Sequence, residues 1–75
     1  MLQVVKCTTV EKAKMENLYV NPYHLYEEPF EIAIGNEFYW IYADPSIPIG
    51  HVAIPAVIRH KYNIDLGDNM SVVTV

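Results

Sequence analysis

The sequence predicts a small, mostly β domain, either a barrel or a sandwich, and three observations carry this prediction. A chain of 75 residues is long enough for one domain with a small core. It contains about six short apolar or β-branched runs separated by turn signals. Its composition, 52% apolar with a net charge of −4, is that of a folded chain rather than a disordered one. We therefore expect a single domain over residues 1–75.

The first part of the chain is expected to supply two strands and two short helical turns. The β-branched run at 2–7 predicts a strand, and residues 17–20 predict a second short extended piece. Residues 11–14 can form one turn of helix between them. Asn21-Pro22 can cap and start another turn, which Pro29 would end.

A hairpin is predicted in the middle of the chain. Gly35-Asn36 separates two apolar runs, 30–34 and 37–43, and both residues tolerate the positive φ angles of a two-residue turn. The second run presents apolar side chains on both of its faces, so we expect both faces to be buried. One face holds Phe38, Trp40 and Tyr42, and the other holds Tyr39 and Ile41.

The last third of the chain predicts a strand, a short helix and a final strand. Residues 51–54 form the first strand, and Pro55 suits the first position of the helix. Asn63 can adopt the left-handed conformation that ends a helix. Ile64 and Leu66 are expected to anchor the exit, and a turn at Gly67-Asp68 leads into a strand at 70–75.

Helical spacing assigns two sides to the predicted short helix. Its apolar side faces the core, and its opposite side faces solvent or a partner, with Lys61 nearer the boundary. The apolar side comprises Ile54, Val57, Ile58 and Tyr62. The outward side comprises Ala56, Arg59, His60 and Asn63.

The basic residues fall in two clusters on an otherwise acidic chain. One cluster is Lys6, Lys12 and Lys14, and the other is Arg59 and Lys61. The net charge argues against general nucleic-acid binding. The longest apolar runs, 38–43 and 52–58, are too short to span a bilayer. If the fold brings the clusters together, they form a basic patch that would attract an acidic partner.

No residue pattern predicts catalysis, a metal site or a cofactor. The three histidines, His24, His51 and His60, lack zinc-ligand spacing, and no phosphate-binding loop occurs. Cys7 is the only cysteine, so the chain cannot form an internal disulfide, which favours a reducing, cytoplasmic location. A single cysteine at a strand end is typical of a buried apolar group rather than a nucleophile.

The segment GHVAIPAVIRHKYNIDLGDNMSVVTV, residues 50–75, resembles the strand–helix–strand element of cradle-loop and double-psi β-barrels. Two families share this element: the AbrB-type DNA-binding proteins, which swap such hairpins between two chains, and the N-terminal domains of type II AAA ATPases. There is also an internal echo. Val20-Asn21-Pro22 and Ala53-Ile54-Pro55 both lead from a strand into a short turn, as a two-fold pseudo-repeat would.

The first fifty residues favour the second family. The chain resembles, over nearly its whole length, the first lobe of the N-domain of the N-ethylmaleimide-sensitive fusion ATPase, NSF. The segments that carry the resemblance are VVKC at 4–7, NLYVNP at 17–22, GNEFYWIYADPSIPIGH at 35–51 and IRHKYNIDLGD at 58–68. The resemblance implies a double-psi β-barrel of about six short strands with one or two single-turn helices.

It also implies a function without catalysis. NSF-type N-domains dock an acidic surface of SNAP adaptors, so that the ATPase rings of the oligomeric parent can disassemble SNARE complexes during vesicle fusion and protein transport. The corresponding partner-binding residues here are Lys6, Arg59 and His60, and we predict Lys61, the next residue on the helix, as a fourth. The chain departs from the family at His60, where a permanent cation is usual, and at Lys61, where an aromatic residue is usual.

Two alternatives remain open. An AbrB-like, swapped-hairpin regulator would use the same basic residues to grip DNA phosphates. The N-lobe of a ubiquitin-segregating AAA ATPase shares the barrel and binds different partners. The docking prediction depends on Lys6 and Arg59 meeting in space.

Overall fold

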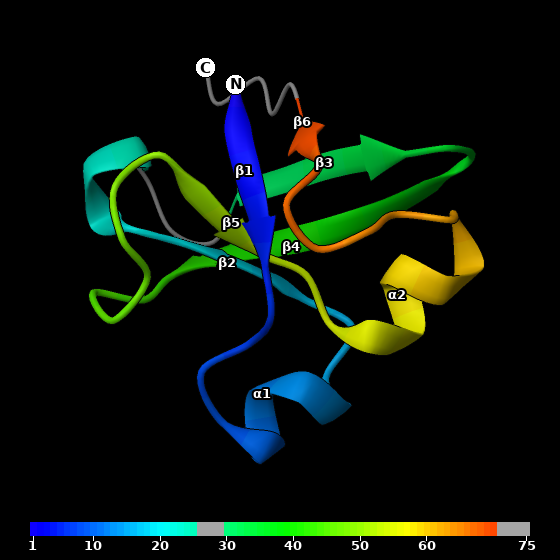
Figure 1. Ribbon diagram of the computed structural model, residues 1–75, viewed down its shortest axis with the longest axis horizontal. Helices are drawn as coiled ribbons and strands as arrows, with labels where there is room; N and C mark the ends of the chain where they lie inside the picture. Colours follow the sequence, from blue (N-terminus) through cyan, green and yellow to red (C-terminus); the bar gives the residue numbers. More distant parts are fainter. Residues whose placement is uncertain (26–29, 71–75) are drawn as a thin grey trace.

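The fold is a single six-stranded sheet that curls into a half-barrel, with short helices at its ends (Figure 1). The structure is a computed structural model that describes residues 1–25 and 30–70. The strands are β1 (Leu2–Val5), β2 (Leu18–Val20), β3 (Phe30–Ile34), β4 (Glu37–Ala43), β5 (His51–Ala53) and β6 (Asn69–Met70). The helices are α1 (Val10–Lys14), α2 (Ala56–Lys61) and a 3-10 turn, η1 (Pro22–His24). The predicted small, mostly β barrel class is confirmed.

The sheet order has an internal two-fold symmetry. It runs β3-β4-β2-β5-β1-β6, which reads the same from either end when β1, β2 and β3 are matched with β4, β5 and β6. At its centre β2 and β5 are antiparallel, with Tyr19 opposite Ala53 and Val20 opposite Val52. On either side lie the parallel pairs β1–β5 and β2–β4. The matched strands β2 and β5 carry the two copies of the strand-then-proline echo in the sequence.

The main core lies on the concave side of the sheet. Alternate residues of each strand point into it, as the period of two requires. Its fully packed members are Leu2, Val4, Leu18, Val20, Ile34, Tyr39, Ile41, Val52, Ile54 and Ile58. Ile58 is the only buried residue within α2 and attaches that helix to the core.

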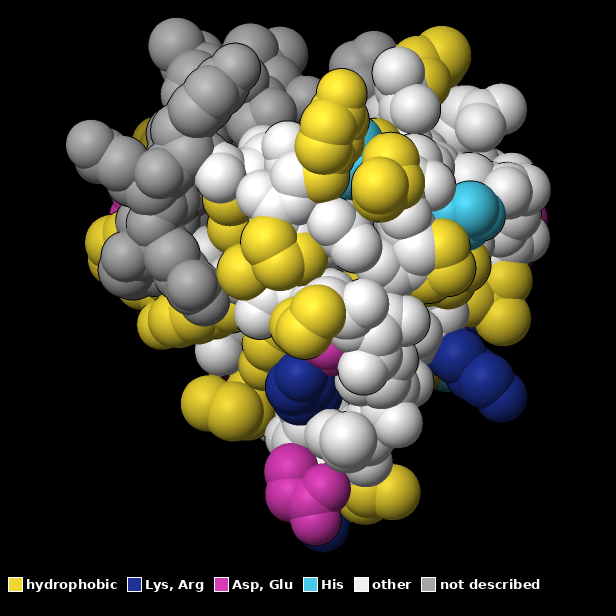
Figure 2. Space-filling model, turned by 90° about the vertical axis from the view of Figure 1, so that its left-hand side faces the viewer, with side chains coloured by type: hydrophobic (Ala, Val, Ile, Leu, Met, Phe, Trp, Pro, Cys, Tyr) yellow, Lys and Arg dark blue, Asp and Glu magenta, His cyan; other side chains and the backbone are white. Residues whose placement is uncertain are grey.

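The opposite side of the sheet is covered only in part, so the prediction that both faces of β4 are buried is wrong. A small second cluster of Tyr19, Ile47 and Ala53 covers the centre of the sheet, and Tyr42 is half-buried against it. Phe38 and Trp40 lie beyond this cluster and are 68% and 46% exposed. Exposed apolar side chains are spread over the surface rather than gathered in one patch on the face shown in Figure 2.

The short helix α2 also differs from its prediction in three places. Pro55 caps the helix instead of starting it, and Val57 and Leu66 are each 52% exposed instead of buried. A helix of six residues has fewer than two turns, so one buried side chain is enough to attach it to the core. Asn63 has the predicted left-handed backbone, with φ of 55°.

The strand bounds agree closely with the sequence, apart from the termini. The two hairpin strands match residue by residue, and Asn21 caps η1 by accepting a hydrogen bond from the Tyr23 N–H. The final strand begins at Asn69, and the rest of its predicted extent, like Pro29, lies outside the described residues. No helix in the described parts of the chain is long and apolar enough to span a membrane.

A side-chain network fixes the hairpin turn against α2. The Tyr39 hydroxyl lies 2.9 Å from the Tyr62 hydroxyl and donates to Glu37 at 2.7 Å, and Lys61 donates to the same carboxylate at 2.6 Å. These bonds raise the pKa of Tyr39, chiefly through Tyr62, and lower that of Glu37, chiefly through Lys61. The network places the ring of Tyr62 directly over Gly35.

Replacing Gly35 with alanine should therefore destabilise the fold by about 1–2 kcal/mol. The residue has φ of +60°, and a Cβ there would lie 2.7 Å from Cε1 of Tyr62. Urea denaturation followed by circular dichroism measures the loss. Gly50→Ala is the matched control, because Gly50 has φ of +88° and nothing within 4 Å of the added Cβ. Because φ of +60° is less strained for alanine than +88°, a clearly smaller loss for Gly35→Ala than for Gly50→Ala would mean that the Tyr62 contact carries little energy.

Candidate functional site

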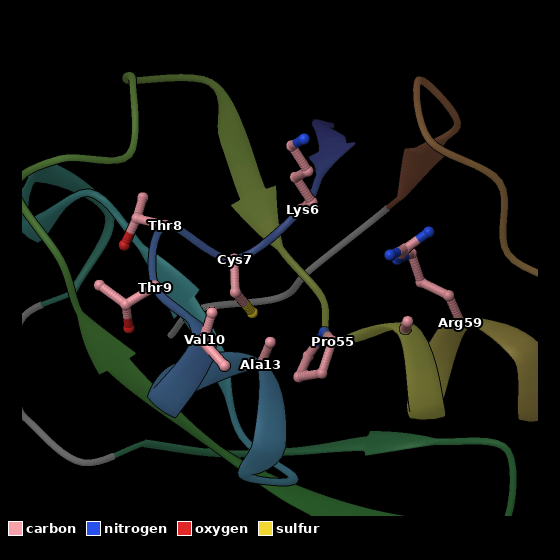
Figure 3. A pocket seen from close by; sticks show the side chains of 9 residues that line it. Lys6, Cys7, Thr8, Thr9, Val10, Ala13, Pro55 and Arg59 are labelled. Carbon is pink, nitrogen blue, oxygen red and sulfur yellow. The ribbon is translucent and has the colours of Figure 1, made fainter.

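Lys6 and Arg59 meet at one pocket, as the docking prediction requires. We call this space of about 380 Å³ the Arg59 pocket. Lys6 follows directly after β1, and Arg59 lies on α2, so the two residues come from opposite ends of the chain. Figure 3 shows Lys6 and Cys7 on one backbone segment of the pocket and Arg59 on another, with Pro55 between the two segments. The fold thus converts distant basic residues into neighbours.

Arg59 is held in a defined orientation. Its Nε donates a hydrogen bond of 2.9 Å to the carbonyl oxygen of Ile54, so the side chain folds back along the start of α2. It is half-buried. Because Nε is used, the two terminal nitrogens remain to donate to a ligand, and a carboxylate can accept from both.

Neither cation of the pocket is neutralised within the described part of the chain. Among the described residues, Lys12 and Lys61 form ion pairs, and Lys6 and Arg59 do not. No aspartate or glutamate lines the pocket. The lining of this pocket therefore contributes two positive charges without an ion-pair partner among the described residues, on an acidic protein.

The rest of the pocket is apolar or hydroxylic. Figure 3 shows the Cys7 sulfur pointing towards Val10, Ala13 and Pro55. Cys7 is half-buried, and burial raises the pKa of its thiol, partly offset by the charges of Arg59 and Lys12. A raised thiol pKa keeps the sulfur neutral, so it serves as apolar lining, in keeping with the packing role predicted for it.

Two threonines in the lining, Thr8 and Thr9, were not predicted from the sequence. Thr8 donates to Asp44 Oδ2 at 2.8 Å and is fully engaged. Thr9 caps α1 by accepting from the Lys12 N–H at 3.1 Å, which leaves its hydroxyl proton for a ligand. A threonine just before a helical run is a cap signal, so the sequence held a clue to this position.

The other predicted site residues lie away from the pocket. His60 is exposed on α2, and Lys61 forms its ion pair with Glu37 at 2.6 Å, at the hairpin. Lys12 also has an ion-pair partner within the chain, because its Nζ lies 2.6 Å from the buried carboxylate of Asp44. The predicted merging of the two basic clusters is therefore limited to Lys6 and Arg59.

The described residues include no group of three or more His, Cys, Asp or Glu side chains placed to hold a metal ion. The site therefore consists of two cations, one free hydroxyl and an apolar lining, which suits recognition of an anionic group. Comparison with family models, curated proteins and solved structures found no match for this chain.

Proposed function

We propose that this chain is a protein-interaction module that docks an acidic surface of a partner protein through Lys6 and Arg59. The observation that carries the proposal is the convergence of these two unpaired cations on one pocket without any acidic residue in its lining. The partner that the resemblance suggests is a SNAP-type adaptor in the cytoplasm, with the chain acting as an NSF-like N-terminal lobe.

The physical basis is electrostatic complementarity at a preorganised site. A cationic side chain that is already hydrogen-bonded to its own main chain loses little conformational freedom when it binds a partner. Less of the binding free energy is then offset by lost entropy. Arg59 is held in this way by Ile54. Carboxylates on a partner would bridge Arg59 and Lys6 and would relieve the repulsion between them.

His60 and Lys61 have lesser parts in this proposal. His60 is exposed on the same helix as Arg59 and can contact a partner at the rim. Lys61 would have to exchange Glu37 for a partner carboxylate, and because this ion pair is exposed to solvent it contributes little to stability and is readily exchanged.

The strand pairing supports a single-chain lobe over a swapped dimer. In an AbrB-like protein, the second half of the barrel comes from another chain. Here the two pseudo-symmetric halves, β1–β3 and β4–β6, pair with each other inside one chain. The acidic composition points in the same direction, because DNA binding relies on a net basic surface.

The test is binding to a purified SNAP-type adaptor, measured by biolayer interferometry at low and high salt. We expect Lys6→Glu and Arg59→Glu each to weaken binding about ten-fold or more, with unchanged circular dichroism, and we expect salt to weaken the wild-type complex. Lys14→Glu is the matched control, since Lys14 is exposed, lies on α1 and does not line the pocket.

Two results would contradict the proposal. One is an equal loss for Lys14→Glu, which would reduce the effect to net charge. The other is a stable dimer in light scattering together with DNA affinity that falls steeply with salt, which would favour the AbrB-like alternative.

A further inference from the structure

Lys6 separates the Arg59 pocket from a second pocket of different character. We call the second space, of about 470 Å³, the Leu66 pocket. Its lining comprises Gln3, Val4, Val5, Lys6, Leu66 and Gly67. Because Lys6 lines both pockets, they are adjacent across one side chain and form a continuous binding surface.

The two pockets differ in what they can accept. The Arg59 pocket offers two cations, and the Leu66 pocket offers aliphatic side chains, with Leu66 itself 52% exposed. Neither lining contains an acidic residue. The complementary ligand therefore carries negative charge at one point and an apolar side chain close to it.

The main chain at this place has an open strand edge. At Val4, the N–H donates to the Asp68 carbonyl and the C=O accepts from the Gly67 N–H, both at 2.8 Å. The pairing between β1 and the segment that leads into β6 ends at Val4. Successive residues of a strand direct their main-chain groups to alternate edges of that strand. Lys6 lies one position past the end of β1 and two positions after Val4, and no described residue hydrogen-bonds its main-chain N–H or C=O.

We propose that the two pockets together bind an extended segment of the partner that carries an acidic residue and an apolar residue two positions apart. The segment lies along the open edge at Lys6, its carboxylate bridges Lys6 and Arg59, and its apolar side chain packs against Leu66. Residues two apart in an extended chain share a face and are about 6.6 Å apart, which suits neighbouring pockets. This inference rests on the proposed function and specifies the partner's chemistry.

The test uses capped synthetic heptapeptides and the whole chain labelled with ¹⁵N. The first peptide has one glutamate and one leucine two positions later, in a background of serine and glycine. We expect it to shift the amide resonances of Lys6, Leu66 and Arg59 in the same titration. Replacing its leucine by serine should weaken binding at least about five-fold, and replacing its glutamate by glutamine should do the same.

Variants of the protein separate this inference from the broader proposal. Leu66→Ser should weaken binding of the glutamate–leucine peptide, whereas Ile49→Ser, which changes an equally exposed apolar residue outside both pockets, should not. If the peptide without leucine binds as tightly as the first, or if no peptide binds, the inference is wrong. The docking proposal would still stand if Lys6→Glu and Arg59→Glu alone weaken binding of the adaptor.

Discussion

Replacing Asp44 with alanine is expected to lower the free energy of unfolding by about 3 kcal/mol, a large share of the total for a domain of this size. Asp44 is 2% exposed and is the only buried charged residue in the described chain. Its carboxylate accepts from Thr8 at 2.8 Å, from Lys12 at 2.6 Å and from the Ser46 N–H at 2.9 Å. Removing it leaves these donors without their acceptor.

The loss should stay below the upper end for buried ion pairs, because the Lys12 side chain is 33% exposed and can return to water. Urea denaturation with circular dichroism gives the value. Asp65→Ala serves as the control, since it removes one negative charge from an exposed residue. Similar losses for the two variants would show that the Asp44 network does not stabilise the fold.

The same carboxylate makes stability depend on pH. Burial, the largest single effect, raises the pKa of Asp44, but hydrogen bonds from Lys12, Ser46 and Thr8 outweigh it and lower the pKa from 3.8 to about 2. A group with a lowered folded-state pKa stabilises fully above its unfolded value and loses that contribution as pH falls. We therefore expect wild-type stability to fall between about pH 4 and pH 2, and Asp44→Asn to show a shallower fall over that range.

Truncating Ile58 to alanine is expected to cost about 2–5 kcal/mol. Ile58 is 1% exposed and is the only residue within α2 that reaches the core. A helix of six residues has no stability of its own, so its position depends on this contact. Partial release of α2 would also displace Arg59, so adaptor binding should weaken with stability.

Val57→Ala is the matched control, since Val57 precedes Ile58 on the same helix and is 52% exposed. It should change the free energy of unfolding by less than about 0.5 kcal/mol. Amide hydrogen exchange adds a local measurement: protection within α2 should drop in Ile58→Ala and remain in Val57→Ala. Retained protection in Ile58→Ala would show that another contact holds α2.

Local chemistry explains which parts of the fold the sequence could predict. The hairpin bounds follow from Gly35-Asn36, because Gly35 has the positive φ that the turn requires, 60°, although Asn36 does not adopt the positive φ expected of it. The helix end at Asn63 follows from the positive φ of that residue, and the cap of η1 follows from the side chain of Asn21. In each case the residue that decides the conformation lies within a few positions of the feature.

Long-range packing explains what the sequence could not predict. The exposure of Phe38 and Trp40 depends on how far the second cluster extends over the sheet, which strand alternation alone does not specify. The ion pair that removes Lys61 from the site joins it to Glu37, 24 positions away. The meeting of Lys6 and Arg59 was a conditional prediction, because it required the order of strands between them.

The mirror-like strand order has a consequence for how the chain must fold. Each of the five pairings among the described strands joins one of β1, β2 and β3 to one of β4, β5 and β6. Among the described strands neither half holds a ladder of its own, so β1, β2 and β3 find no strand partner until β4, β5 and β6 have been synthesised. The two halves must therefore fold together in one late, cooperative step. Because their strand pairings join residues far apart in the sequence, we expect this folding to be slow.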